Sequence, residues 1–382
     1  MGARAALNKC GWQRFTGNEA AVASTRYGWL QDLEALSPTV AALNLTAQVS
    51  DEPYWDTVTN LAINADAFNL SGCPHHNGAI ARWLGGLAAN GVTQSQLSRL
   101  LVDLTSRNTY GTFSELSGYG LLLDAHLPFQ IQVPMGKAGI LNPNGADLDG
   151  RLTISGDVLF DIKAFGLHEH LSNRLHERLS GEFSSQFVAI EGSADVAVSV
   201  MTDLLGRGYS SLVSELRAKG LARRDGLDVS LRPTRQVQVT SGTLDPYALA
   251  KNHAEYAFGF AKQFARRKPF MLIFVIHPWL GGLRLSTDFP GDADTFMRSF
   301  ARRTFMQFLR DKAKIFGVSR AIASRLLSGI MFINAWQPTD AKHTHRLFLN
   351  PYAKHPIPGL TVRHLEVGIP GLRKDDFQND VY

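Results

Sequence analysis

Two short runs of alternating apolar and polar residues, joined by a glycine-containing turn, make residues 145–165 the most constraining part of this chain. In a strand, successive side chains point to opposite faces of the sheet. Three apolar side chains therefore share one face in each run: Leu148, Leu152 and Ile154 in the first, and Val158, Phe160 and Ile162 in the second. The pattern predicts a β-hairpin with one apolar and one polar face.

The turn length fixes which residues of the hairpin face each other. A three-residue turn at Ser155–Asp157 matches apolar with apolar and polar with polar positions, pairing Ile154 with Val158, Leu152 with Phe160, Arg151 with Asp161 and Asp149 with Lys163. Asp149 would then lie diagonal to Asp161, with Cβ atoms about 5–8 Å apart. Two carboxylates at this separation can share a hard cation such as Mg²⁺.

Two carboxylates beside a lysine suit phosphodiester hydrolysis, because a metal neutralises phosphate charge and an ammonium group positions water or stabilises negative charge. The pattern of Asp149 on one strand and Asp161-Ile162-Lys163 on the next resembles the PD-(D/E)xK nuclease superfamily. The resemblance covers at most residues 105–280. It implies an α/β fold with a restriction-endonuclease-like αβββαβ core and a mixed sheet. It also implies that Asp149 and Asp161 bind Mg²⁺ and that Lys163 orients the nucleophile.

The same resemblance implies another carboxylate on a helix before the hairpin. Residues 110–126 have an apolar stripe with helical spacing, formed by Phe113, Leu116, Gly120, Leu123 and the following Leu127. Glu115 lies beside this stripe, so we expect its side chain to be half buried. Glu115 would assist catalysis through the metal or through water.

The sequence leaves alternatives open at this hairpin. No proline precedes Asp149, where the family name would place one, and Asp147 is an alternative ligand. A second acidic-x-Lys tripeptide occurs at residues 340–342, without a flanking strand pattern. The polar face of the hairpin could also be simply charged and solvated, with no metal bound.

The remaining core elements follow from the sequence on either side of the hairpin. Residues 128–134 alternate as a strand bounded by prolines. Two helix–strand pairs compete for the crossover to a parallel strand: residues 167–179 with 186–190, and residues 245–267 with 270–276. We favour the second pair, because Asp245 and Pro246 suit a helix start and residues 270–276 are entirely apolar. Residues 166–244 would then be an insertion that contacts substrate.

Helical regions are expected on both sides of this core. Residues 1–104 form an N-terminal region with a possible role in target recognition, and the helical patterns at 79–87 and 93–101 resemble a helix-turn-helix. Residues 281–382 form a C-terminal region with a basic face, including one helix over residues 295–316. Phe300, Phe305 and Phe308 are its expected core face. The candidate phosphate contacts are Arg151, Arg298, Arg302, Arg310 and Lys314.

Composition supports a globular protein with a polyanionic partner. The chain has 382 residues, of which 45% are hydrophobic and 19% charged, and a net charge of +5. Cys10 and Cys73 are the only cysteines, which favours a reducing cytoplasm, and no apolar run is long enough to span a bilayer. No P-loop, nucleophile elbow or dinucleotide motif occurs. Histidines near residues 75, 168–176 and 343–345 lack a recognised zinc spacing.

Composition favours a cytoplasmic protein, and the resemblance implies a Mg²⁺-dependent endonuclease that cleaves double-stranded DNA, such as a type II restriction or other phage-defence nuclease. Cleavage of both strands at one site usually requires two active sites, so a homodimer or higher homo-oligomer is expected. The first alternative is a catalytically inactive DNA-binding or assembly protein with the nuclease fold. A third possibility is a hydrolase that uses paired carboxylates on small phosphates or sugars.

Overall fold

The structure is a computed structural model, and it describes residues 26–48, 74–105, 109–165, 175–176, 178–192, 198–224, 226–232, 246–276, 290–334, 345–378 and 380. Expectations for Asp245, residues 340–342, both cysteines, His168, His170 and His343 lie outside these ranges. The protein is of the α/β class and divides into two units. One comprises residues 1–120, 171–192 and 196–235, and the other comprises residues 121–170, 193–195 and 236–382. The three predicted regions stay predictions.

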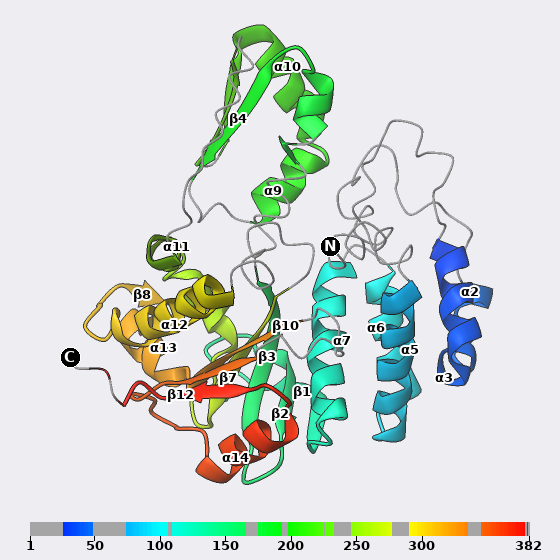
Figure 1. The fold of residues 1–382 in the computed structure, drawn as a ribbon, viewed down its shortest axis with the longest axis vertical. Coiled ribbons are helices and arrows are strands. Elements are labelled where there is room, and N and C mark those ends of the chain that lie inside the picture. The colour runs from blue at the N-terminus through cyan, green and yellow to red at the C-terminus, as the bar shows by residue number, and fades with distance from the viewer. Residues whose placement is uncertain are drawn as a thin grey trace. The chain divides into compact units, whose positions relative to one another are not determined.

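The first unit contains a group of helices (Figure 1). They are α2 (Arg26–Leu36), α3 (Pro38–Ala41), the 3₁₀-helix η2 (Thr46–Gln48), α5 (Pro74–Ala89), α6 (Gln94–Leu104) and the first part of α7 (Thr109–Asp124). Trp29 is completely buried, and its indole N–H donates to Asn77 at 2.8 Å. Thr93 and Gln96 form a capping box that starts α6. The expected helices at 79–87, 93–101 and 110–126 are confirmed, whereas the helix-turn-helix function stays a prediction.

A small sheet and two helices complete the first unit. β4 (Phe187–Gly192), β6 (Leu227–Arg232) and β5 (Leu221–Arg224) pair antiparallel in that order. α9 (Val198–Leu205) and α10 (Tyr209–Lys219) accompany them, and the C-cap residue of α10 is Gly220, whose φ of 68° suits glycine. Because β4 pairs with β6, residues 186–190 are not the parallel partner of the hairpin.

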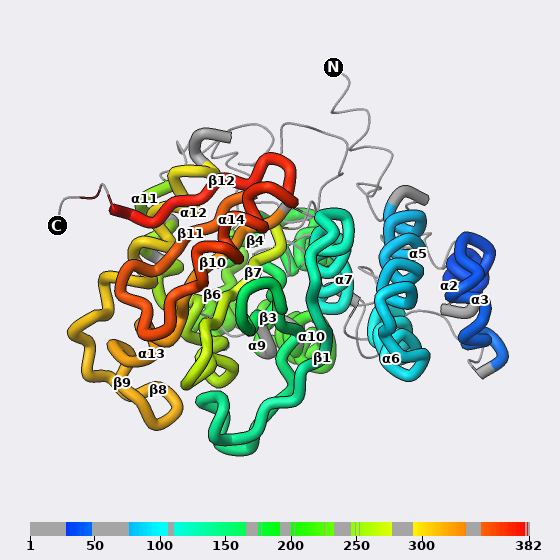
Figure 2. The backbone as a smooth tube through the Cα atoms, turned by 90° about the horizontal axis from the view of Figure 1, so that it is seen from below, coloured from blue at the N-terminus to red at the C-terminus, as the bar shows by residue number. Residues whose placement is uncertain are grey.

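The second unit is built on a seven-stranded mixed sheet (Figures 1 and 2). Its strands, in spatial order, are β1 (Phe129–Met135), β2 (Ala146–Leu152), β3 (Val158–Phe165), β7 (Phe270–Ile276), β10 (Gly329–Asn334), β11 (Arg346–Leu349) and β12 (Arg373–Asp375). The pairs β1–β2, β2–β3 and β10–β11 are antiparallel. The pairs β3–β7, β7–β10 and β11–β12 are parallel.

Helices cover this sheet on both faces. Figure 1 shows α12 (Pro290–Met306) and α13 (Arg320–Leu326) on one face and α14 (Gly359–Gly368) on the other. Two short elements precede β7: α11 (Pro246–Asn252) and the 3₁₀-helix η3 (Tyr256–Gln263). In the described part of the chain, no helix has the length and apolar character needed to cross a membrane.

The apolar run at residues 270–276 forms β7, and every one of its residues is buried. Strands with parallel neighbours and helices on both faces need apolar side chains on both sides. The predicted parallel pairing of this strand with the hairpin is therefore confirmed, because β3 pairs with β7 from Leu159–Phe270 to Phe165–Ile276. The single helix expected over 245–267 is wrong, because residues 253–255 form a turn between α11 and η3.

The expected helix over residues 295–316 also ends earlier than predicted. α12 ends at Met306, Arg310 follows in a turn, and Lys314 lies on the two-residue strand β8 (Lys314–Ile315). β8 pairs with β9 (Val318–Ser319) through a turn in which Gly317 has a φ of 84°. Arg310 and Lys314 therefore do not form a helical row. The core face is confirmed, because Phe300, Phe305 and Phe308 are all buried.

The predicted hairpin is confirmed, but its register differs from the three-residue turn. Leu152 pairs with Val158 and Gly150 with Phe160, so residues 153–157 form a five-residue turn. The N–H of Thr153 instead donates to the carbonyl of Pro128, the residue before β1, at 3.0 Å. A shift of two residues keeps every side chain on its predicted face.

The close packing of the hairpin leads to a test at Gly150. A Cβ atom added there would lie 2.4 Å from the Phe160 ring and 2.5 Å from the Gln130 carbonyl oxygen, and both are inside van der Waals contact. Gly150→Ala should therefore lower the free energy of unfolding by about 1–3 kcal/mol. Gly136→Ala is the control, because nothing lies within 4 Å of its added Cβ. Equal urea midpoints for the two variants would contradict this account.

Candidate functional site

Two carboxylates and one ammonium group converge where β2 and β3 meet. Lys163 Nζ lies 2.7 Å from Asp161 Oδ2 and 3.5 Å from Asp149 Oδ2. Asp161 and Lys163 are two residues apart on β3, so they share a face of the sheet. Asp149 comes from β2. The structure thus brings together three of the four residues that the family resemblance implies as catalytic.

A local separation of the two strands places Asp149 in this cluster. Main-chain pairing of β2 with β3 runs from Leu152 to Gly150. At the next residue, the Asp149 carboxylate takes the place of a main-chain acceptor, and the Ile162 N–H donates to Asp149 Oδ2 at 2.6 Å. In the continued register Asp149 lies opposite Asp161, so the expected pairing with Lys163 is wrong by two residues.

The backbone of β1 is also irregular at this level. Ile131 pairs with Gly150 and Val133 with Leu148, which places Gln132 opposite Asp149. Gln132 has a φ of 50°, in the left-handed region that residues other than glycine rarely adopt. Such outliers cost free energy and persist where the surrounding structure holds them. The strained residue therefore marks the position at which the regular hairpin gives way to the carboxylate cluster.

Asp161 is the most deeply buried member of the cluster. Its exposed fraction is 0%, against 20% for the Lys163 side chain and 17% for the Asp149 side chain. Lys163 lies at ion-pair distance, but among the described residues neither Asp161 oxygen has a hydrogen bond of good geometry. A buried carboxylate with so few partners is destabilising unless another group compensates it. The solvated-face interpretation therefore does not fit Asp161.

The environment of Asp161 favours its protonated form. Burial raises the pKa of the Asp161 carboxyl well above its usual range, the charge of Asp149 raises it further, and Lys163 acts in the opposite direction. With all three groups ionised, two negative charges would face one positive charge. The site therefore favours either a bound proton or an additional cation near Asp161.

Aromatic residues of η3 form an apolar border beside Lys163. The Tyr256 hydroxyl donates to the Ala164 carbonyl at 3.2 Å, and Lys163 Nζ lies 5.8 Å from the centre of the Phe260 ring. Burial raises the pKa of Tyr256 to about 12, with Lys163 opposing this shift, so the phenol is neutral at pH 7. Sequence reasoning missed both residues. The sequence does contain one indication of them, because the two aromatic residues are four positions apart, a helical spacing, in the segment before β7.

The other acidic candidates differ in position. Asp147 is exposed, so Asp149 is the β2 carboxylate that joins Lys163. Glu115 lies on α7 and is half buried, as expected. It belongs to the first unit, whereas the cluster belongs to the second. Its role as a third carboxylate stays a prediction.

Several basic candidates are already engaged with side chains of this protein. Arg151 donates to Gln130 at 2.8 Å and pairs with Asp157 at 3.3 Å. Arg298 pairs with Asp375 at 2.7 Å and with Asp380 at 2.5 Å, and Arg302 pairs with Asp380 at 2.7 Å. Arg310 and Lys314 are exposed. Their roles in phosphate binding stay predictions.

The described residues contain no group of three or more His, Cys, Asp and Glu side chains that could hold a metal. Asp149 and Asp161 alone still fit Mg²⁺, which commonly binds one or two carboxylates and takes its other ligands from water and phosphate. Of the histidines considered for zinc, His176 contacts the Val188 carbonyl at 3.1 Å and His76 packs against Phe113.

Comparisons with models of known protein families, with curated proteins and with solved structures give no match to this chain.

Substitution of Asp161 tests whether this carboxylate is a structural ion-pair partner. The pKa of Asp161 is raised in the folded state, so its protonated carboxyl stabilises the fold fully at pH below the pKa that Asp161 has in the unfolded chain. This stabilisation is lost as pH rises toward the pKa that Asp161 has in the folded protein. Asp161→Asn leaves no ionisable group at this position, so the variant should not lose this stability as pH rises. In EDTA at pH 8 it should stabilise the protein by about 0.5–2 kcal/mol, with a smaller gain at pH 5.

The measurement is thermal unfolding at both pH values, with Asp147→Asn as the control because Asp147 is exposed on the neighbouring strand β2, outside the cluster. Destabilisation of Asp161→Asn at both pH values would instead assign Asp161 and Lys163 to a structural ion pair.

Proposed function

We propose that this protein hydrolyses phosphodiester bonds of DNA with the help of Mg²⁺ at Asp149 and Asp161. The observation that carries the proposal is the fully buried Asp161 carboxylate, which lies beside a second carboxylate and has only Lys163 at ion-pair distance among the described residues. A bound divalent cation would neutralise this excess negative charge. A phosphate group could then approach the cation beside the partly exposed Lys163 amine.

The order of elements supports a restriction-endonuclease-like core. Along the chain come the helix α7, the antiparallel strands β1, β2 and β3, the crossover elements α11 and η3, and the parallel strand β7. The elements from β4 to β6 are inserted between β3 and α11. This order corresponds to the αβββαβ arrangement that the resemblance implies. In the present protein the sheet extends further, through β10, β11 and β12.

Each residue of the cluster has a distinct proposed role. Asp149 and Asp161 would hold Mg²⁺, which lowers the pKa of water and neutralises phosphate charge when it is bound. Lys163 would hold its ammonium toward the attacking water and stabilise negative charge in the transition state. Asp161 must release its proton before it serves as a ligand, so cation affinity should rise with pH. Glu115 is proposed as an assisting carboxylate.

We also propose a biological setting for this activity. The net charge of +5 is compatible with a double-stranded DNA partner. A type II restriction or other phage-defence nuclease suits a small core accompanied by many additional helices. Action as a homodimer would allow both strands to be cut.

Replacement of Lys163 is the sharpest test of the mechanism. Lys163→Ala should slow Mg²⁺-dependent cleavage of plasmid and phage DNA by about 100–1,000-fold, because it removes a positive charge from the transition state. Binding of the same DNA in EDTA should stay unchanged. Product ends would be sequenced to identify the cleavage site.

Two aspartate variants provide the matched comparison. Asp149→Asn should abolish Mg²⁺-dependent cleavage, whereas Asp147→Asn should cleave at the rate of the unmodified protein, because Asp147 is exposed outside the cluster. Undiminished cleavage by Lys163→Ala would rule out the proposed mechanism. DNA binding without any cleavage by the unmodified protein would favour the catalytically inactive alternative.

A further inference from the structure

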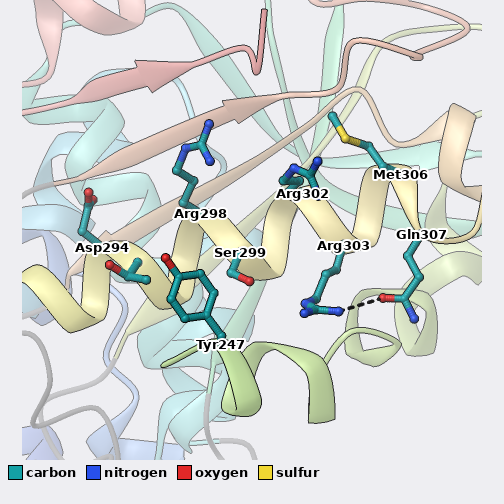
Figure 3. Close-up of a pocket in the computed structure, with 9 residues that line it drawn as sticks. Tyr247, Asp294, Arg298, Ser299, Arg302, Arg303, Met306 and Gln307 are labelled. Carbon is teal, nitrogen blue, oxygen red and sulfur yellow. Dashed lines mark hydrogen bonds between the residues drawn. The ribbon is translucent and has the colours of Figure 1, made fainter. Parts of the chain in front are cut away.

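A groove of about 680 Å³ runs along α12 in the second unit, apart from the carboxylate cluster (Figure 3). It is lined by Tyr247 of α11 and by eight residues on or just after α12: Asp294, Thr295, Arg298, Ser299, Arg302, Arg303, Met306 and Gln307. Ligand sites are commonly concave and of about 300–1,000 Å³. The groove therefore has a volume suited to a single nucleotide.

The lining residues of α12 form two rows, because residues four apart lie on the same side of a helix. One row contains Asp294, Arg298, Arg302 and Met306, and the other contains Thr295, Ser299, Arg303 and Gln307. Figure 3 shows Arg298, Arg302 and Met306 pointing to one side of α12, and Arg303 and Gln307 to the side on which Tyr247 lies.

The Arg298 row is largely neutralised within the protein. Arg298 and Arg302 are bound by the carboxylates of Asp375 and Asp380 at 2.5–2.7 Å. Burial opposes ionisation of Asp380, but its hydrogen bonds from Arg298 and Arg302 hold its pKa below the usual range. An incoming phosphate would have to displace these carboxylates from Arg298 and Arg302.

In the Arg303 row, no carboxylate of the described residues forms an ion pair with the arginine. Among the described residues, the Arg303 guanidinium has one hydrogen bond, to the neutral Gln307 side chain at 3.4 Å. Its Nε is buried, and no described residue accepts a hydrogen bond from it. A guanidinium presents donors in a planar fork that matches phosphate oxygens. Ser299, one turn before Arg303, adds a hydroxyl on the same side of α12.

Tyr247 supplies an aromatic surface opposite this row. It is 60% exposed, although it lines the groove, and it comes from α11, which packs against α12. Exposed aromatic rings beside cationic groups bind unpaired nucleotides, because the base stacks on the ring while the phosphate meets the cation. Tyr247 and Arg303 therefore provide the two contacts that one nucleotide requires.

We propose that the groove binds one unpaired nucleotide of the nucleic-acid substrate, with its phosphate at Arg303 and Ser299 and its base against Tyr247. The identity of the ligand rests on the proposed nuclease function. In a duplex the base faces are already stacked, so this site selects single-stranded segments, overhangs or displaced nucleotides. The groove thus gives the protein a preference for DNA with an unpaired segment.

The test is fluorescence anisotropy in EDTA, with a labelled short oligothymidylate and a duplex of equal length as probes. Tyr247→Ala and Arg303→Gln should each weaken oligothymidylate binding about tenfold, while duplex binding changes less. Tyr352→Ala and Arg363→Gln are the controls, because they remove an exposed aromatic ring and an exposed cation elsewhere in the same unit. Both controls should bind as the unmodified protein does.

A further variant separates binding from helix stability. Arg303 lies in the last turn of α12, where a positive charge complements the helix dipole. Arg303→Lys keeps that charge but loses the planar donors, so it should weaken oligothymidylate binding without lowering the melting temperature. Changes in melting temperature alone, with binding unchanged in Tyr247→Ala and Arg303→Gln, would overturn the proposal.

The assay in EDTA distinguishes the two proposals. Loss of oligothymidylate binding in the groove variants supports the nucleotide site, even if the protein cleaves nothing with Mg²⁺. Mg²⁺-dependent cleavage with unaltered oligothymidylate binding in the groove variants defeats the nucleotide site alone.

Discussion

The buried carboxylate of Asp161, held beside Lys163 and Asp149, is the interaction on which the functional account depends. A fully buried carboxylate is costly, and in the described structure its only cationic partner is Lys163, at 2.7 Å. Either a proton or a metal cation can therefore neutralise the Asp161 carboxylate at this site. A stable fold retains such a group where the rest of the structure offsets its cost, which is typical of sites that bind or react.

The fold explains why Asp161 is buried. β3 is paired on one side with β2 and on the other with the entirely apolar strand β7. Asp161 and Phe165 lie on the same face of β3. At the end of the strand, Phe165 packs against Phe274, Phe300 and Phe332, so aromatic side chains cover this face next to the cluster. The separation of β2 from β3 after Gly150 leaves the position that the Asp149 carboxylate fills. Sheet pairing and burial together thus concentrate charge at one point.

The sequence predicts those features that depend on local patterns. Two-residue alternation correctly places Asp161 and Lys163 on one face, and the apolar run 270–276 correctly predicts the parallel strand. The predicted hairpin register is wrong because the Thr153 N–H donates a hydrogen bond to the Pro128 carbonyl, a contact that no local sequence pattern encodes. The aromatic border at Tyr256, and the pairing of Arg298 with Asp375 and Asp380, depend on residues distant in sequence. Such contacts need the tertiary fold.

The most direct test of the central claim is a pH titration of the Asp161 carboxyl group. It is monitored by carboxyl-carbon NMR of the selectively labelled protein, with and without Mg²⁺. The account predicts that without Mg²⁺ the Asp161 resonance titrates well above the usual range for aspartate, and that Mg²⁺ moves its midpoint to lower pH. An Asp161 resonance that titrates in the usual range and does not respond to Mg²⁺ would contradict the account.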